Sequence, residues 1–125
     1  MENNLGELAQ RLEITAQKLS DDLVIMRMPV EGNRQPAGIL HGGANGALVE
    51  QAASSLALLR APSGKLPVGT ELNVSQLRPA TGGYVTASAT LLSQMRSSMC
   101  SQVEIRDDTG NLTAVGRMTL VFISE

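Results

Sequence analysis

Glu50 is a lone carboxylate in a segment that otherwise carries no charge. Residues 44–59 contain no proline and are mostly small or apolar, and the nearest Lys or Arg is Arg60. A carboxylate in apolar surroundings is costly unless it is paired or hydrogen-bonded, and Ser54, four residues on, would share a helix face with it. Such a carboxylate can act as a general base or a nucleophile. The alternative is a glutamate that reaches solvent at a helix edge.

Two glycines, Gly42 and Gly43, follow His41 just before this segment. The first turn of a helix presents unpaired N–H groups and the positive end of the helix dipole. Glycine allows a ligand to approach that backbone closely. The pair therefore predicts an oxyanion site, where negative charge developing on a carbonyl oxygen would be stabilised. An ordinary glycine-rich helix start is the alternative.

The elements that must position these groups form an α+β fold. A helix that is apolar on all sides is typically buried, which predicts a long buried helix over 44–59. An amphipathic helix of about four turns is predicted at the N-terminus, because apolar residues recur there at spacings of three and four: Leu5, Leu8, Leu12, Ala16 and Leu19. Strands are predicted over 23–28, 70–77, 84–94, 97–106 and 112–123, with a hairpin turn at 107–111. Strands joined by short turns form a curved antiparallel sheet around the buried helix.

Composition excludes several classes of function. A chain of 125 residues predicts one domain over 1–125. The 10 Lys and Arg against 12 Asp and Glu form no basic run, which argues against a nucleic-acid partner. One cysteine, Cys100, and one histidine cannot build a zinc site of the usual kinds or an intrachain disulfide, so no metal is expected. No signal peptide or membrane span is expected, which predicts a cytoplasmic protein without a membrane partner.

Together these features resemble the hotdog-fold acyl-CoA thioesterases. The resemblance is to the branch that includes the phenylacetate-pathway enzymes and the Arthrobacter-type 4-hydroxybenzoyl-CoA thioesterases. It is carried by Gln35, by the run His41-Gly42-Gly43, by Glu50 and by Ser54 at fixed spacing, and it extends from about residue 23 to residue 123. It implies a hotdog fold and hydrolysis of an acyl-CoA to free acid and CoA.

The resemblance also implies a role for each of these residues. Glu50 is expected to be the base or nucleophile, and the Gly42 amide is expected to polarise the thioester carbonyl. Gln35 would orient the carbonyl or the attacking water, and Ser54 would position water or Glu50. His41 is expected to shape the loop rather than to transfer protons. No cofactor is expected beyond the CoA of the substrate, because a thiol with a pKa near 8.5 leaves with little assistance.

Contacts to CoA are assigned by the resemblance and by position in the predicted strands. Arg96, at the start of a predicted strand, or Arg78, at the end of another, could bind the phosphates of CoA. A solvated charge on the surface is the commoner explanation for such an arginine. Glycines at 82 and 83 could admit the pantetheine arm or simply form a turn. The acyl pocket would be lined by Met, Leu, Val and Ala, which fits either an aliphatic or an aromatic acyl group. The predicted substrate contacts are Gly43, Asn73, Gly82, Gly83, Arg96, Ser97 and Ser98.

Helix geometry predicts that the active site is shared between subunits. Glu50 lies eight residues beyond Gly42, and at 1.5 Å per residue this places them roughly 12 Å apart along the axis. One carbonyl group cannot then contact both residues of the same chain, so either one of the two assignments is wrong or the site joins residues of two protomers. A two-fold dimer with two composite sites would satisfy both roles. The resemblance implies the same arrangement, often as a dimer of dimers.

Two other functions remain open alongside thioester hydrolysis. Hotdog hydratases and dehydratases that act on acyl-CoA or acyl carrier protein also place an acid on the buried helix, but their histidine lies further ahead of it. A non-catalytic acyl-CoA-binding hotdog protein is the second alternative. A Ser-His-Asp triad is set aside because the chain contains no Gly-x-Ser-x-Gly motif.

Overall fold

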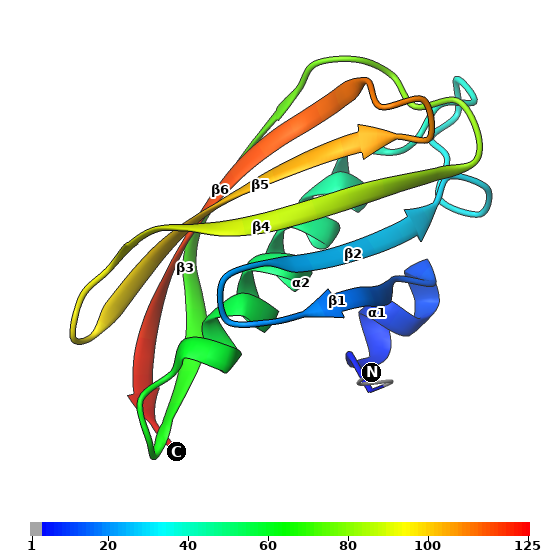
Figure 1. The fold of residues 1–125 in the computed structure, drawn as a ribbon. Helices are drawn as coiled ribbons and strands as arrows, with labels where there is room; N and C mark the ends of the chain where they lie inside the picture. The colour runs from blue at the N-terminus through cyan, green and yellow to red at the C-terminus, as the bar shows by residue number, and fades with distance from the viewer. Residues whose placement is uncertain (1–3) are drawn as a thin grey trace.

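A curved antiparallel sheet packs on one side of a long helix in the computed structural model, which describes residues 4–125 (Figure 1). The elements in chain order are α1 (Glu7–Leu12), β1 (Thr15–Leu19), β2 (Val24–Pro29), α2 (Gly42–Arg60), β3 (Lys65–Gln76), β4 (Tyr84–Gln94), β5 (Ser98–Asp107) and β6 (Leu112–Ser124). The predicted α+β class, with a long central helix, a curved sheet and an N-terminal helix, is confirmed. None of the helices in the described part of the chain is long and apolar enough to cross a membrane.

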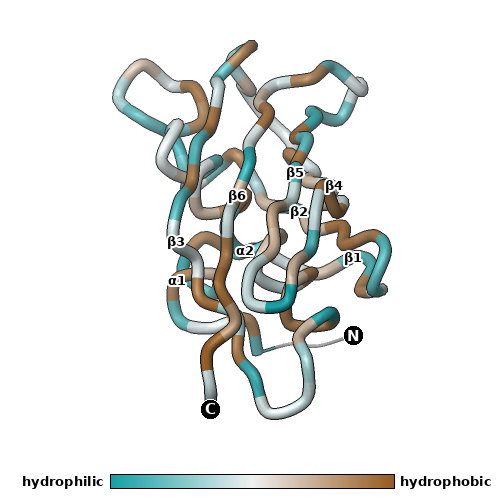
Figure 2. Tube along the Cα trace, turned by 90° about the vertical axis from the view of Figure 1, so that its left-hand side faces the viewer, coloured by the Kyte–Doolittle hydropathy of each residue, from teal (hydrophilic) through white to brown (hydrophobic). Residues whose placement is uncertain are grey.

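The sheet has the strand order β1-β2-β4-β5-β6-β3, and every neighbouring pair is antiparallel. β1 and β3 are therefore its two edges. β3 pairs with β6 along its whole length, and its other edge has no partner within the described chain. Figure 2 shows β3 beside β6, whose C-terminal half is strongly hydrophobic.

Small residues allow α2 to lie close to the sheet. Its buried side is made mainly of alanine with a few larger aliphatic side chains. Gly116 on β6 marks the closest approach, because a Cβ there would lie 2.8 Å from Val49 Cγ1 and 3.1 Å from the Asn73 carbonyl oxygen. A residue larger than glycine would push helix and sheet apart.

The prediction that α2 is buried on all sides is wrong for its outer face. Glu50, Leu58 and Leu59 are exposed, because the sheet covers only one side of the helix. The buried residues of α2 are Ala44, Asn45, Leu48, Val49, Ala52, Ala53, Leu56 and Ala57. An apolar outer face without a cover in the single chain indicates a contact with something outside it.

The N-terminal helix is shorter than predicted. It ends at Leu12, after which Glu13 adopts a left-handed conformation with φ 60°. The chain then continues as β1, in which Thr15 pairs with Arg27 of β2. The prediction of four helical turns, made from the spacing of apolar residues, is therefore wrong beyond Leu12. Ile14 and Thr15 are β-branched and favour extended backbone, and the available edge of β2 supplies the hydrogen bonds.

β3 is longer than the predicted strand, which began at Thr70. It begins at Lys65 and includes Pro67. Proline is tolerated there because an edge strand does not need every N–H for pairing. The register with β6 shifts between Gly69 and Glu71, so the strand carries a bulge at that point.

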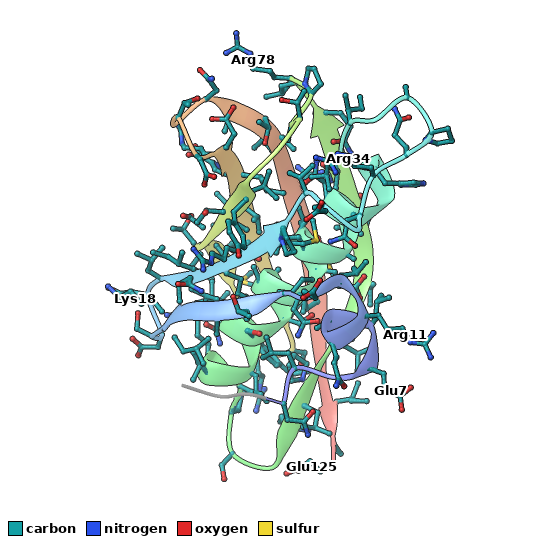
Figure 3. The ribbon with its side chains drawn as sticks, turned by 90° about the vertical axis from the view of Figure 1, so that its right-hand side faces the viewer. Glu7, Arg11, Lys18, Arg34, Arg78 and Glu125 are labelled. Carbon is teal, nitrogen blue, oxygen red and sulfur yellow. The ribbon has the colours of Figure 1, made fainter. Side chains whose placement is uncertain are left out.

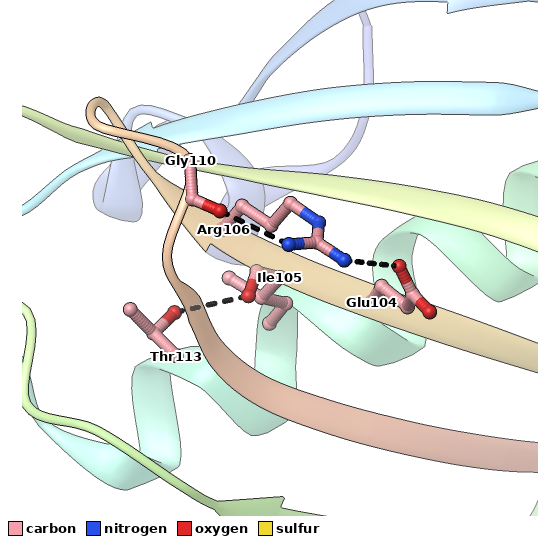
Figure 4. A network of polar contacts seen from close by, with 5 residues as sticks. All are labelled: Glu104, Ile105, Arg106, Gly110 and Thr113. Carbon is pink, nitrogen blue, oxygen red and sulfur yellow. Dashed lines mark hydrogen bonds and ion pairs between the residues drawn. The ribbon is translucent and has the colours of Figure 1, made fainter.

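The predicted hairpin turn between β5 and β6 is confirmed, with Gly110 at φ 88°. Arg106 extends across it and donates to the Gly110 carbonyl oxygen over 3.0 Å and to the Glu104 carboxylate over 3.2 Å (Figure 4). Thr113 donates to the Ile105 carbonyl oxygen over 3.1 Å. The bonds to Gly110 and Ile105 tie the end of β5 to the turn and to the start of β6.

Candidate active site

His41 caps the N-terminus of α2. Its Nδ1 accepts a hydrogen bond from the Gly43 N–H over 2.8 Å, and its backbone N–H donates to the Asn33 carbonyl oxygen over 2.9 Å. Because Nδ1 is an acceptor here, the ring proton of the neutral imidazole lies on Nε2. The geometry agrees with the loop-shaping role expected for His41.

The Gly42 N–H is the group left for an oxyanion. It belongs to the first residue of α2, where backbone N–H groups have no partner within the helix. Within residues 4–125 it donates no hydrogen bond, whereas the Gly43 N–H is already held by His41. The helix dipole adds positive potential at this point. Gly42 is therefore the better candidate donor of the two glycines.

Gln35 lies in the same pocket as Gly42. The pocket, about 380 Å³, is enclosed by the start of α2, the loop before it and the connection that follows β3. The Gln35 side-chain oxygen accepts a hydrogen bond from the Ala37 N–H. Its side-chain nitrogen makes no hydrogen bond among the described residues, so it is free to donate to a substrate carbonyl or to water. The structure thus brings Gln35 and Gly42 together.

Glu50 lies two turns further along α2, on its exposed face. Its Oε2 is 3.4 Å from the position that a Cβ on Gly69 would occupy. The carboxylate makes no hydrogen bond or ion pair with any residue from 4 to 125, so the expected bond from Ser54 is absent. The missing side chain at Gly69 makes room for Met118, whose Cε would lie 2.0 Å from that Cβ, and the Glu50 carboxylate lies next to the same position.

Gly42 and Glu50 contact β3 at widely separated positions. Gln76 Nε2 donates to the Gly42 carbonyl oxygen over 3.1 Å, whereas Glu50 lies beside Gly69. The strand positions between Gly69 and Gln76 span roughly 20 Å at about 3.3 Å per residue. Within one chain, a single thioester carbonyl therefore cannot reach both groups. The rise along α2 gives a shorter separation, roughly 12 Å, which still exceeds what one carbonyl group can span.

Ser54 lies at a second, apolar pocket on the Glu50 side of α2. This pocket, about 550 Å³, is formed by the second half of α2, the start of β3 and the N-terminal segment. Its walls carry exposed leucines and a valine on both elements: Leu58, Leu59, Leu66 and Val68. The lining is aliphatic, as expected for an acyl pocket, although methionine and alanine do not contribute to it.

Several predicted CoA contacts lie apart from Gly42. Asn73 and Gln76 are three positions apart on β3, so their side chains lie on opposite faces of the strand. Because Gln76 contacts α2, Asn73 points away from the helix, and it donates a hydrogen bond to the Glu71 carboxylate over 3.2 Å. Gly83 has φ 66°, and a Cβ there would lie 2.2 Å from the Asp108 carboxylate. The turn therefore explains Gly83 without a ligand, whereas a Cβ on the neighbouring Gly82 would meet open space.

The segment Arg96-Ser97-Ser98 lies at the Glu50 end of the sheet. Ser98 on β5 pairs with Val121 on β6, and Val121 pairs with Val68, the residue next to Gly69. Arg78 lies at the opposite end, close to the Gln35 and Gly42 pocket, and its side chain projects outward (Figure 3). The two candidate phosphate ligands therefore belong to different halves of the site.

The sequence reasoning missed Asn45 and Gln76. Asn45 Nδ2 donates to Gln76 Oε1 over 2.9 Å, and both residues line the pocket with Gly42. Asn45 is the one buried polar residue of α2. An asparagine inside an apolar helix was therefore a signal that could have been followed, whereas Gln76 gives none without the register of β3.

The comparisons with known proteins identify the family. Residues 37–114 match the model of the thioesterase superfamily. The chain is 33% identical over 121 residues to the proofreading thioesterase EntH of Cronobacter sakazakii, covering 96% of this chain and 88% of that protein. The crystal structure of a thioesterase from Haemophilus influenzae superposes with a TM-score of 0.91 at 35% identity, covering 95% of this chain and 84% of that one.

Two further sets of solved structures bear on the site. A Staphylococcus aureus thioesterase, 32% identical with a TM-score of 0.91 over 95% of this chain and all of that one, was solved with a glutamate replaced by alanine. A second structure of the same enzyme has a glutamine replaced by alanine, fifteen residues before that glutamate in its sequence. It superposes with a TM-score of 0.88 over 92% of this chain and 97% of that one. Gln35 and Glu50 have the same separation. A Bacillus halodurans protein of the same fold, 23% identical with a TM-score of 0.84 over 93% of this chain and 75% of that one, was solved with CoA.

The family match covers more than half of the chain, and the relatives align over nearly all of it. The whole fold, with its six-stranded sheet and central helix, superposes on the Haemophilus influenzae structure. This chain therefore belongs to the thioesterase superfamily and is a thioester hydrolase with the hotdog fold.

Proposed function

We propose that the protein hydrolyses an acyl-CoA thioester to free acid and CoA at a site shared by two subunits. The observation that carries the proposal is the separation of Gly42 and Glu50 on β3. One chain supplies the carbonyl-polarising Gly42 N–H and Gln35, and its partner supplies Glu50 and Ser54. The CoA-bound structural neighbour and the spacing of the altered residues in the Staphylococcus aureus thioesterase support this assignment.

Two mechanisms, general-base and nucleophilic catalysis, are possible with these groups. In the first, Glu50 removes a proton from water, the water oxygen attacks the carbonyl carbon, the C–S bond breaks, and the thiolate takes the proton from Glu50. In the second, a carboxylate oxygen attacks directly, the thiolate leaves, and water then hydrolyses the mixed anhydride. In both, the Gly42 N–H stabilises the negative charge on the carbonyl oxygen.

The edge of β3 is the surface through which two chains would share these sites. It offers unpaired backbone groups together with Leu66, Val68 and Leu72, which are 40%, 43% and 38% exposed. Antiparallel pairing of two β3 strands about a two-fold axis near Leu72 and Asn73 sets Gly69 of one chain opposite the partner subunit's Gln76. Each Glu50 then approaches the partner's Gly42, which gives two equivalent sites per dimer. A dimer of dimers remains part of the proposal and is tested by native mass spectrometry.

The two pockets suggest how the substrate lies. The aliphatic pocket beside Ser54 takes the acyl group, and its volume of about 550 Å³ accommodates either an aliphatic chain or a single ring. CoA then extends either toward Arg78, beside the Gln35 and Gly42 pocket, or toward the Arg96-Ser97-Ser98 turn at the Glu50 end of the sheet, and either group can meet its phosphates. Gly43 and Gly82 stay candidate contacts of the pantetheine arm, whereas Asn73 lies on the wrong face of the sheet for that role.

No metal or other cofactor is needed for this chemistry. The leaving thiol has a pKa near 8.5, roughly that of cysteine, so it departs as a thiolate without strong acid catalysis. One carboxylate and one oxyanion donor are therefore sufficient, and activity is expected to survive dialysis against EDTA. A cytoplasmic location is part of the same proposal, and cell fractionation tests it.

A screen of acyl-CoA and aryl-CoA thioesters, with detection of the released thiol, tests the function. Wild-type protein is expected to release thiol from at least one of them, and Glu50→Gln is expected to lose about a hundredfold or more in kcat. Glu31→Gln, the same substitution at an exposed loop position away from β3, is the matched control. Hydration of an enoyl-CoA without thiol release would instead favour a hydratase. Acyl-CoA binding without turnover, unchanged by Glu50→Gln, would favour the non-catalytic alternative.

A further inference from the structure

Asn45 and Gln76 connect the candidate oxyanion donor to the edge strand. Gln76 Nε2 donates to the Gly42 carbonyl oxygen over 3.1 Å, and Asn45 Nδ2 donates to Gln76 Oε1 over 2.9 Å. Asn45 belongs to α2 and Gln76 is the last residue of β3. The two side chains therefore form a relay between the first turn of the helix and the edge of the sheet.

The direction of this relay follows from the Gly42 carbonyl. A carbonyl oxygen can only accept, so the Gln76 side chain must present its nitrogen to Gly42 and its oxygen to Asn45. Asn45 must in turn present its nitrogen to Gln76. The amide orientations are thus determined by chemistry, and Asn45 Oδ1 is left on the side away from the relay.

Asn45 Oδ1 has no hydrogen-bond partner among the described residues, and the residue is only 4% exposed. A buried acceptor without a partner destabilises the folded chain. An alanine at this position would avoid that cost and would favour the helix more strongly. Among residues 4–125, the asparagine side chain makes one hydrogen bond, the one to Gln76.

Gly42 needs such a restraint more than another residue would. Glycine has no Cβ and rotates easily about both backbone dihedrals, so the direction of its N–H is not fixed by the helix alone at its first residue. Gln76 holds the carbonyl oxygen, and its Nε2 lies 3.0 Å from the place where a Cβ of Gly42 would stand. The relay therefore restrains the Gly42–Gly43 peptide directly, and it restrains the Gly42 N–H, which belongs to the preceding peptide, through the Gly42 Cα.

We propose that Asn45 and Gln76 are positioning residues that hold the Gly42 N–H in the direction required by the oxyanion, at some cost to the stability of the fold. The proposal rests on the thioesterase function above. A well-oriented donor favours the transition state more than the bound substrate, so its loss lowers kcat and leaves KM nearly unchanged. Removing an oxyanion donor altogether lowers kcat by about a hundredfold to a thousandfold. Loosening one that remains present is expected to lower kcat by about tenfold.

The test compares Asn45→Ala and Gln76→Met with wild type, measuring kcat, KM and melting temperature on the best acyl-CoA of the screen. Both variants are expected to lose about tenfold in kcat, with KM changed by less than about threefold. Asn45→Ala is expected to melt no lower than wild type, because it removes the unpaired oxygen. The double variant is expected to lose no more kcat than either single variant, since both break one relay.

Ser101→Ala is the matched control. Ser101 Oγ is the other buried side-chain oxygen in residues 4–125 without a hydrogen-bond partner, but it lies on β5 in the core of the sheet. Its removal is expected to leave both kcat and KM unchanged.

Wild-type kcat in either single variant overturns the proposal. So does a loss of kcat that is only proportional to a loss of folded protein, or additive losses in the double variant. Failure of the thioesterase function itself gives a different result, in which wild-type protein releases no thiol from any acyl-CoA.

Discussion

Complementation between two inactive chains tests the shared site directly. One chain carries Glu50→Ala and keeps Gln35, and the other carries Gln35→Ala and keeps Glu50. In a hybrid dimer, one site combines the intact Glu50 of one chain with the intact Gln35 of the other, and the second site lacks both. Random pairing of equal amounts produces about one-half hybrid dimers with one intact site of two, which predicts about one-quarter of wild-type activity per chain.

The assay measures thiol release after the two variants are refolded together. Different affinity tags on the two chains allow hybrids to be purified through both tags, and these are expected to reach about one-half of wild-type kcat per chain. Each variant alone gives the background. A mixture of Glu50→Ala with Glu50→Gln is the matched control, because none of its dimers contains an intact Glu50.

The refuting result is the absence of recovery in purified hybrids that are shown by mass to contain both chains. A site complete within one chain predicts that outcome, since each chain of the hybrid then carries its own defect. The structure argues against it because Gly42 and Glu50 meet β3 at Gln76 and Gly69, roughly 20 Å apart along the strand.

Three further predictions concern stability. Glu13→Gly is expected to raise the free energy of unfolding by up to about 1 kcal/mol in urea titration, because glycine relieves the left-handed backbone with φ 60°; a loss would show that the Glu13 side chain has a compensating role. Gly116→Ala is expected to cost about 1–3 kcal/mol, since its Cβ would lie 2.8 Å from Val49 Cγ1; an unchanged urea midpoint would contradict this packing. Although burial opposes it, hydrogen bonds from Thr109 and Asn111 hold the pKa of Asp107 below the ordinary aspartate value of 3.8. Its contribution is therefore present above that pH and lost as pH falls through the folded-state pKa, so the stability difference between wild type and Asp107→Asn should shrink in acid; a difference independent of pH would refute this.

The sheet could be predicted largely from local patterns. β4 runs over the predicted residues, Tyr84–Gln94, because alternating apolar residues follow a pair of glycines. α2 begins at Gly42, two residues before the predicted start, because His41 supplies the cap. Side-chain alternation and turn chemistry act over a few residues, so the sequence alone displays them.

The N-terminal segment could not be predicted in this way. Its apolar spacing fits a helix, and residues beyond Leu12 do bury apolar surface, but as the strand β1. The deciding factor is the free edge of β2, which pairs with Thr15 and the residues after it. That edge lies in a different part of the chain, and a window of neighbouring residues contains no information about it.

The residues of the candidate site also differ in whether local sequence patterns could predict them. Gln35, Gly42 and Glu50 could be found because their spacing is local and fits a known family pattern. The pairing of Asn45 with Gln76 depends on the place where β3 ends beside the start of α2, which is set by the register with β6. The exposure of Glu50 was only the alternative interpretation, because an apolar helix looks buried whether its cover comes from the same chain or from another.

Pairing of the β3 edge with a second chain would serve both stability and catalysis. An exposed apolar edge strand promotes aggregation unless another chain pairs with it, and β3 exposes Leu66, Val68 and Leu72 along such an edge. Pairing this edge with a second copy would bury those side chains and the apolar face of α2. The same pairing would bring Glu50 to the partner's Gly42. The surface that most needs a partner for stability is therefore the surface on which the two halves of the chemistry lie, and activity is expected to fall when dilution separates the subunits.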